Sequence, residues 1–208
     1  MATFTLFTNP MSRGQIARWA LHEVGADYEQ VLVPWDAKPA ALLAANPMGK
    51  VPTIVHHSET GARVVTEAAA ICAYLAEVTP QAGLLPSDAE AADYFRWMFF
   101  AAGPLEQAIV ARSMGWEVPQ EREGMVGFGN LERTLAALSY HLGRNAFVCG
   151  DRFTMADVYV GSQVDWGLIF GSVPPEPAFV GYAERFQARA AYKAAKAIDN
   201  ALIEEARK

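Results

Sequence analysis

The sequence predicts a small α/β domain followed by an all-helical domain, and three observations support this division. Short alternating or β-branched runs occur through Val65, and no strand pattern of comparable strength follows. Residues 79–88 then hold two prolines and a glycine, which is typical of a linker. Beyond the linker, apolar residues recur at helical spacing. We therefore expect an α/β domain at 1–78, a linker at 79–88 and a helical domain at 89–208.

The composition is that of a globular protein and argues against several classes of partner. Hydrophobic residues make up 52% of the 208 residues and charged residues 19%, which allows a large core. The 17 basic and 23 acidic residues include no basic cluster, so we expect no nucleic-acid binding. Without an 18-residue apolar run or a signal sequence, we expect neither a membrane span nor secretion. Cys72 and Cys149 form neither a CxxC pair nor a metal pattern, and they suit the reducing cytoplasm.

The first domain is predicted to alternate strands and helices. Residues 3–8 alternate hydroxyl and apolar side chains, and Asn9-Pro10 ends that strand. Ser12 is a favourable N-cap for the next helix, and Gly25 is a natural stop. In order, we expect a strand at 3–8, a helix from Ser12 to Val24, a strand at 28–33, a short helix within 37–45, strands at 53–55 and 63–65, and a helix at 67–78.

The second domain is predicted to hold five helices. Gly103-Pro104 should bend the first of them. Thr154 and Asp157 form a capping box, in which the Asp157 carboxylate reaches back to the N–H of Thr154; we assign this signal to folding. The expected helices span 90–112, 122–142, 154–169, 179–189 and 192–205.

The stretch from Asn46 to Val55 predicts a loop that delivers a buried strand. Pro52 stands at the mouth of that strand, where a proline is tolerated. A cis Val51–Pro52 bond would leave the Val51 backbone as a free edge, to which an extended peptide can add like a strand. An ordinary loop with a trans bond is the alternative, and the residues alone favour it because most X–Pro bonds are trans.

The sequence contains, in this order, the stretches NPMSRG at 9–14, NPMGKVP at 46–52, VTEAAAI at 65–71 and GDRFTMAD at 150–157. Together they resemble the cytosolic glutathione transferases over essentially the whole chain. The pair Ser12-Arg13, followed by an Ile-x-x-Trp helix, is most similar to bacterial and fungal serine-type members. The resemblance implies a thioredoxin-like α/β domain followed by a helical domain, and a homodimer.

The resemblance implies glutathione as a co-substrate. Val51 would pair its backbone with the cysteinyl unit, and the helix start at Glu67 would hold the γ-glutamyl end. Lys50 would lie near the glycyl end or the backbone; a solvated loop lysine is the alternative. The expected glutathione-binding residues are Arg13, Lys50, Val51, Pro52, Glu67 and Ala68.

The chain departs from the family at two positions that bear on the chemistry. Ala68 stands where the family usually has serine, and the tyrosine that several classes use is absent, its place falling on or near Phe7. The hydroxyl that activates the thiol is therefore expected to be Ser12 or Thr8, with Asn9 as an amide donor. A helix-capping role alone is the alternative for Ser12.

These expectations combine into a transferase that joins the glutathione thiolate to a small hydrophobic electrophile, without a metal or redox cofactor. Two other functions stay open: glutathione-dependent reduction of disulfides or peroxides, and non-catalytic binding in a stress response. The electrophile pocket is expected between the domains, under the first helix. Its candidate wall residues are Phe99, Phe100, Met114, Trp116 and Trp166.

Overall fold

A computed structural model describes residues 2–207, which form two compact units. The first unit comprises the chain up to Leu85 together with the segment from Ala188 onward, and the second unit is Pro86–Gln187. This grouping differs from the predicted division at one end, because the last helix had been assigned to the helical domain.

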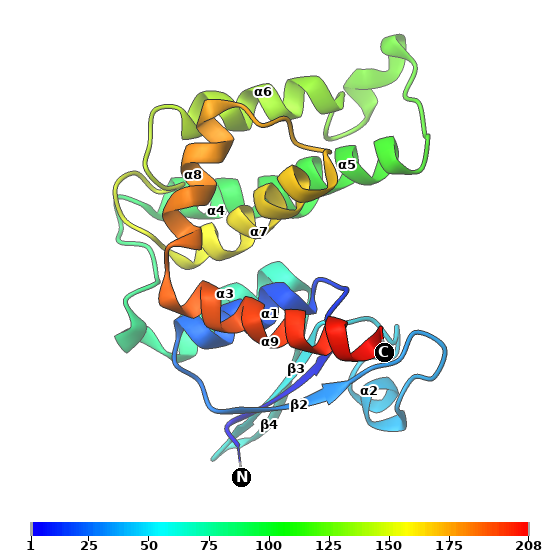
Figure 1. The fold of residues 1–208 in the computed structure, drawn as a ribbon. Helices are drawn as coiled ribbons and strands as arrows, with labels where there is room; N and C mark the ends of the chain where they lie inside the picture. Colours follow the sequence, from blue (N-terminus) through cyan, green and yellow to red (C-terminus); the bar gives the residue numbers. More distant parts are fainter. Residues whose placement is uncertain (1, 208) are drawn as a thin grey trace. The chain divides into compact units, whose positions relative to one another are not determined.

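The first unit is built on a four-stranded mixed sheet with the order β2-β1-β3-β4 (Figure 1). Strand β1 is parallel to β2 and antiparallel to β3, and β3 is antiparallel to β4. The β3–β4 hairpin is longer than predicted, because His57 and Ala62 pair across it instead of forming a turn. The strands are β1 (Phe4–Thr8), β2 (Tyr28–Leu32), β3 (Thr53–Ser58) and β4 (Gly61–Thr66).

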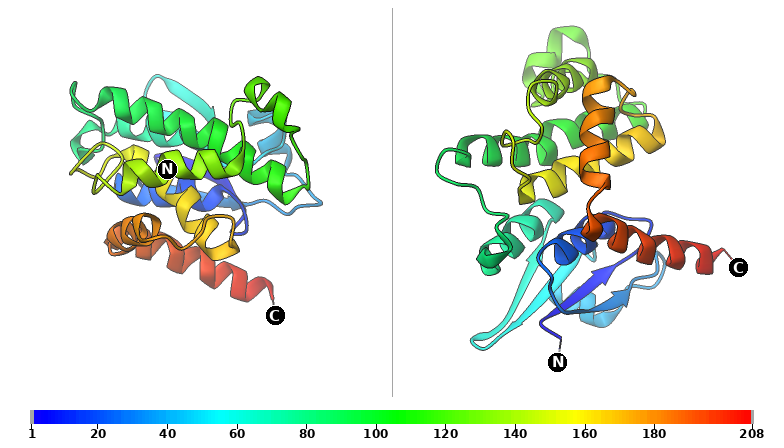
Figure 2. Two further views of the ribbon diagram at one scale, coloured as in Figure 1. Left: turned by 90° about the horizontal axis from the view of Figure 1, so that it is seen from above. Right: turned by 60° about the vertical axis from the view of Figure 1, so that its left-hand side comes forward.

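Helices cover both faces of this sheet. Figure 1 and Figure 2 show α1 (Gly14–Glu23), α3 (Ala68–Val78) and α9 (Ala190–Ala206) on one side. On the other face lies α2 (Ala40–Ala45), whose Leu42 packs with Phe7 and Val33. This arrangement confirms the predicted α/β class.

Ion pairs explain why α9 belongs to the first unit. Arg18 of α1 donates to Asp199 of α9 at 3.0 Å, and both side chains are only 1% exposed. Burial raises the pKa of Asp199, although the Arg18 guanidinium acts in the opposite direction. A second pair joins Glu23 to Arg189, with Nε to Oε1 at 2.7 Å. Apolar periodicity cannot predict such long-range partners, because it predicts only that the segment forms an amphipathic helix.

The second unit is helical, as predicted. The bend expected at Gly103-Pro104 is a π-helical segment, η2 (Ala101–Leu105), between two α-helices. Helix α7 is buried around nearly all of its circumference along Met155–Asp165, so it forms the centre of the unit. The α-helices are α4 (Ala91–Phe100), α5 (Glu106–Ser113), α6 (Leu131–Leu142), α7 (Met155–Phe170) and α8 (Pro177–Gln187).

The predicted helix at 122–142 is wrong over residues 122–130. A short 3₁₀ turn, η3 (Gln120–Met125), is followed by a loop, and α6 begins only at Leu131. Gly129 has a φ of +62°, and the Asn130 side chain caps the helix by accepting the Arg133 N–H at 2.8 Å. Glycines and a strong N-cap therefore override the apolar periodicity.

The capping box at the start of α7 is confirmed. The buried Asp157 carboxylate accepts the Thr154 N–H at 2.8 Å, as expected. It also accepts the Val148 N–H at 2.8 Å and the Tyr182 hydroxyl at 2.9 Å. Burial raises the pKa of Asp157 to about 6, although these hydrogen bonds act in the opposite direction.

Within residues 2–207 we find no helix with both the length and the apolar character needed to span a bilayer.

Candidate functional site

The loop between β1 and α1 carries the first candidate residue, Ser12. Helix α1 starts at Gly14 with Arg13 at the N-cap, so Ser12 is the residue before the N-cap and not the N-cap itself, as was predicted. Its Oγ nevertheless accepts the Gly14 N–H at 2.9 Å, and it donates to the Asn9 carbonyl at 2.7 Å. Ser12 is half-buried. Its hydroxyl therefore stabilises the helix start, and it can donate to a ligand by turning away from Asn9.

Thr8, the second hydroxyl candidate, points into the interior. It is fully buried, and its Oγ1 has no hydrogen-bond partner among residues 2–207. A Cβ on Gly14 would lie 2.0 Å from this oxygen, so α1 can approach β1 only because residue 14 is glycine. Sequence reasoning missed Gly14, although it follows Ser12-Arg13 directly. Thr8 packs beneath the loop, and its side chain is not accessible at the surface.

Asn9 holds the loop to the end of the second strand. Its Nδ2 donates to the Val33 carbonyl at 3.0 Å, and its Oδ1 accepts the Met11 N–H at 2.9 Å. Asn9, the expected amide donor, thus forms hydrogen bonds through both the nitrogen and the oxygen of its carboxamide. One Nδ2 hydrogen remains beyond that bond.

The second candidate segment is the loop before β3, where the Val51–Pro52 bond is cis. The buried Asn46 braces this loop, since its Nδ2 donates to the Lys50 carbonyl at 3.2 Å and to Thr53 Oγ1 at 3.1 Å. Among the residues that the structure describes, neither the N–H nor the C=O of Val51 has a partner. The trans bond that the residues alone favoured is therefore wrong, and the free backbone edge expected for a cis bond is present at Val51.

The third candidate segment joins β4 to α3. Glu67 is the N-cap of α3, with φ 64° and ψ 118°, and it is the one non-glycine residue of the described chain with positive φ. Such a conformation costs about 1–3 kcal/mol and persists only when the surroundings enforce it. The Glu67 side chain is exposed and has no partner within residues 2–207, while Ala68 is buried. Glu67 thus presents a free carboxylate beside a helix N-terminus.

The register of the sheet brings these three segments to one end of it. Thr53 of β3 lies opposite Phe7 of β1 and opposite Thr66 of β4. The Thr8–Ser12 loop leaves β1, the Val51-Pro52 segment enters β3, and Glu67 leaves β4, all at that end. Ligands of open α/β sheets bind beyond strand ends of this kind. The arrangement forms one site from three segments that are distant in sequence.

Charged side chains of both signs surround this site. Arg13 and Lys50 are exposed on two of its loops, and Glu67 is exposed on the third. Helix α3 adds unsatisfied N–H groups and a partial positive charge at its start. An extended peptide with carboxylates and an ammonium group matches these features. In the described chain, no cluster of three His, Cys, Asp or Glu residues is placed to hold a metal ion.

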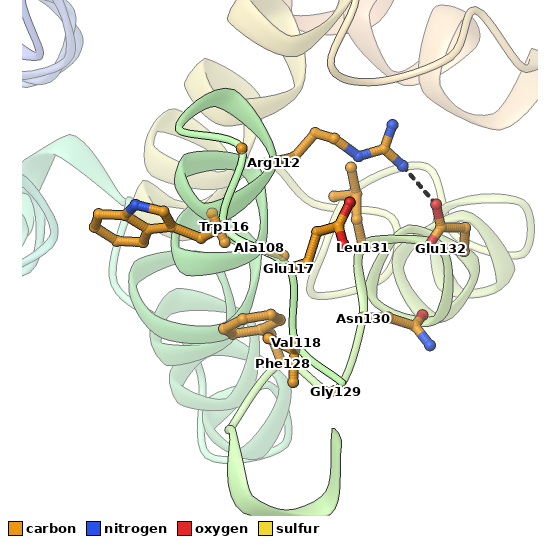
Figure 3. Close-up of a pocket in the computed structure, with 12 residues that line it drawn as sticks. Ala108, Arg112, Trp116, Glu117, Val118, Phe128, Gly129, Asn130, Leu131 and Glu132 are labelled. Carbon is orange, nitrogen blue, oxygen red and sulfur yellow. Dashed lines mark hydrogen bonds and ion pairs between the residues drawn. The ribbon is translucent and has the colours of Figure 1, made fainter. Parts of the chain in front are cut away.

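The second unit contains two adjoining cavities. One, of about 500 Å³, lies between the end of α5 and the start of α6, where Arg112 bonds Glu132 at 2.6 Å (Figure 3). The other, of about 490 Å³, is mainly apolar and lies against α5. Residues that line both cavities are Ala111, Trp116, Val118 and Phe128.

Of the five aromatic and methionine residues expected in the electrophile pocket, Trp116 lines both cavities, and the other four line neither. Phe99 and Met114 are 69% and 60% exposed. Phe128, which was not predicted, lies in the loop that was mistaken for a helix, and Val118, also not predicted, lies just before that segment.

Comparison with known proteins identifies both halves of the chain. The family model described as "Glutathione S-transferase, N-terminal domain" matches residues 11–78, and that described as "Glutathione S-transferase, C-terminal domain" matches residues 89–166. The chain is 32% identical to a zeta class glutathione S-transferase from Euphorbia esula, over 71% of this chain and 68% of that protein. It is also 29% identical to elongation factor 1-gamma 3 from Oryza sativa subsp. japonica, over 64% of this chain and 32% of that protein.

A solved structure extends the likeness to the fold. A sphingomonad glutathione S-transferase complexed with glutathione superposes with a TM-score of 0.74 and 27% identity, covering 94% of this chain and 98% of that one.

Proposed function

Because the chain belongs to the glutathione S-transferase family, we propose that it transfers the thiolate of glutathione to a small hydrophobic electrophile. The observation that carries the proposal is the convergence of Ser12, Val51 and Glu67 at one end of the sheet. Glutathione is an extended tripeptide with a thiol, two carboxylates and an ammonium group. Each of these groups has a counterpart in the site.

Glutathione would bind through all three segments. The unpaired Val51 backbone accepts the cysteinyl unit as an added strand. The N-terminus of α3, with the Ala68 N–H, holds the γ-glutamyl carboxylate, and Glu67 takes the ammonium group. Lys50 and Arg13 are exposed cations for the remaining carboxylate. Because residue 68 is alanine and has no hydroxyl, the start of α3 would bind the γ-glutamyl carboxylate through backbone N–H groups alone.

In the reaction, the glutathione sulfur attacks the electrophilic carbon as a thiolate. A sulfur–carbon bond forms, the bond from carbon to the leaving group breaks, and the leaving group departs with the bonding electrons. The thiol proton passes to solvent when the thiolate forms. The task left to the protein is to keep the sulfur ionised and positioned.

The energy needed for ionisation is within reach of a single hydroxyl. A thiol with a pKa of ~8.5 is only a few per cent ionised at neutral pH, and lowering it by ~2 units needs ~2.7 kcal/mol. A hydrogen bond to a charged group contributes ~1.5–3 kcal/mol. The N-terminus of α1 adds ~0.3–1 kcal/mol. Ser12, at that helix start, is the residue proposed to donate the bond.

The electrophile is proposed to occupy the mainly apolar cavity beside Trp116. Its volume lies within the range of about 300–1,000 Å³ that small-molecule pockets have. Val110, Val118 and Phe128 supply apolar lining, so the cavity suits a compact hydrophobic molecule.

Two observations keep other functions in view. Ser12 Oγ already has two partners, and the similarity to an elongation factor 1-gamma extends over 64% of the chain. These favour a non-catalytic, glutathione-transferase-like binding or stress-response protein. Glutathione-dependent reduction of disulfides or peroxides would use the same glutathione site.

Titration of the protein with glutathione comes first. If glutathione does not bind, only the non-catalytic binding or stress-response function is left. Turnover of a generic aryl halide is then compared with turnover of a glutathionyl disulfide and of cumene hydroperoxide. The proposed transferase conjugates the aryl halide fastest. Preference for either of the other two substrates would replace it with the reductase or peroxidase.

We further propose a cytoplasmic homodimer, as implied by the family. Two large apolar side chains of α4, Phe95 and Phe99, are 52% and 69% exposed in the single chain. Their burial by a second copy, with the α/β domain of one subunit meeting the helical domain of the other, would account for them. Sedimentation at micromolar concentration should give twice the chain mass of 22.6 kDa, and a monomeric mass would contradict the proposal.

A further inference from the structure

The loop that carries Ser12 is held from two sides within the first unit. On one side, Asn9 joins it to Val33 at the end of β2. On the other side, the Gln15 side chain of α1 folds back, and its Nε2 donates to the Pro10 carbonyl at 2.5 Å.

Both anchors fix the same peptide plane. The Pro10 carbonyl and the Met11 N–H belong to one planar peptide group. Gln15 holds its carbonyl end, and Asn9 Oδ1 holds its N–H end at 2.9 Å. Since proline has no N–H, the carbonyl is the only hydrogen-bonding group of Pro10. Ser12 follows Met11 directly. The orientation of this peptide plane therefore determines the direction in which the chain continues through Ser12 into α1.

A third residue, distant in sequence, supports Gln15. Lys196 of α9 donates from Nζ to Gln15 Oε1 at 2.9 Å, across 181 residues of sequence. The buried Arg18–Asp199 pair, one turn further along α9, fixes the helix on α1. Lys196 is half-buried and its ammonium also lies 5.5 Å from the Tyr192 ring centre. The position of its Nζ is therefore set by the packing of α9.

We propose that Lys196 is a positioning residue for the thiol-activating hydroxyl, acting through Gln15 and the Pro10 carbonyl. The inference rests on the proposed function, because it concerns the same site. An ammonium on the oxygen of a carboxamide polarises its N–H, so hydrogen bonds in a chain strengthen one another. Lys196 itself touches neither Ser12 nor any group proposed to react.

The test compares Lys196→Met with Lys196→Arg and with Lys193→Met, a matched change at an exposed lysine of the same helix. Two quantities are measured: kcat with an aryl halide at saturating glutathione, and the ultraviolet absorbance of the bound glutathione thiolate at neutral pH. Displacement of a reacting group by ~1 Å can cost ~10²-fold, so weakening one of the two anchors should lower both quantities roughly three- to tenfold. KM for glutathione should change little, Lys196→Arg should restore both quantities, and Lys193→Met should match the wild type.

A double-mutant cycle with Gln15→Met separates positioning from a general weakening of α9. If the two residues act in one chain of contacts, the double variant loses no more than the worse single variant. Additive losses, or unchanged thiolate absorbance in a folded Lys196→Met protein, would overturn the inference. If Lys196→Met does not fold, Gln15→Met alone must show the loss with KM kept, and wild-type behaviour would overturn the inference. Wild-type protein that neither binds glutathione nor forms a thiolate would instead refute the proposed function.

Discussion

Two helix starts in this protein use hydroxyl residues, and they differ in what surrounds the hydroxyl. At the start of α7, Thr154 and Asp157 are fully buried, and the carboxylate of Asp157 accepts bonds from Val148, Thr154 and Tyr182. At the start of α1, Ser12 is half-buried, and its two partners are backbone groups of its own loop.

The difference separates a folding signal from a functional one. The carboxylate at α7 has its donors in fixed positions and no access to solvent, so its capping box can serve only stability. At α1, the hydroxyl lies at the end of the sheet where the Val51 backbone and the Glu67 carboxylate lack partners among the described residues. Unused hydrogen-bonding capacity beside a hydroxyl, and not the cap itself, marks the candidate site.

The largest effect is expected at the buried helix start. Asp157→Ala leaves the Val148 N–H, the Thr154 N–H and the Tyr182 hydroxyl without their acceptor. The free energy of unfolding should fall by ~3–5 kcal/mol, since each unsatisfied buried group costs ~1–3 kcal/mol. Urea denaturation measures this change, with Tyr182→Phe as the milder comparison. A loss below about 1 kcal/mol would show that the network is not what stabilises α7.

The same carboxylate predicts a pH dependence of stability. Burial raises the pKa of Asp157 from 3.8 to about 6, so the folded state favours the protonated form. Its stabilising contribution is present below pH ~4 and is lost as the pH rises through ~6. The difference in unfolding free energy between wild type and Asp157→Asn should therefore shrink by up to ~3 kcal/mol over that window. A constant difference from pH 4 to 7 would contradict the shift.

The next effect concerns ligand binding at the start of α3, which lies at the same end of the sheet as Ser12. Glu67→Ala should weaken glutathione binding by ~1.5–3 kcal/mol, as expected for losing a hydrogen bond to a charged group. Isothermal titration calorimetry gives the dissociation constant, and exposed Glu59→Ala on the neighbouring hairpin serves as the control. An unchanged constant would remove Glu67 from the site.

A smaller stability effect tests how closely α1 must approach β1. Gly14→Ala would place a Cβ 2.0 Å from Thr8 Oγ1, and overpacking of this kind costs ~1–3 kcal/mol. The melting temperature and kcat should both fall. Adding Thr8→Ala removes the clashing oxygen and should recover part of each, whereas no recovery would mean that Thr8 is not the obstacle.

Local signals made much of the fold predictable. The prolines, glycines and caps at Pro52, Gly25 and Thr154 predicted the segments that the structure contains. These features depend on a few neighbouring residues, so a single sequence reveals them. The free edge at Val51 was expected only for a cis Pro52, whereas the residues alone favoured a trans bond.

Long-range partners could not be predicted in the same way. The contacts of Lys196 with Gln15 and of Asp199 with Arg18 each span 181 residues, and they place α9 in the first unit. Gly14 was missed for a related reason, because its importance lies in the space under α1. The false helix at 122–130 arose because apolar spacing outweighed three glycines in the interpretation.

The most direct test of the central claim is the pH midpoint of turnover for Ser12→Ala. If Ser12 donates to the thiolate, losing a bond worth ~1.5–3 kcal/mol should raise the midpoint by ~1–2 pH units, lower the rate at neutral pH and leave glutathione affinity nearly unchanged. Thr8→Ala should leave the midpoint in place, since Thr8 is buried. If Ser12→Ala costs only the ~0.5–2 kcal/mol of stability typical of a lost cap and the midpoint stays where it was, the account is contradicted.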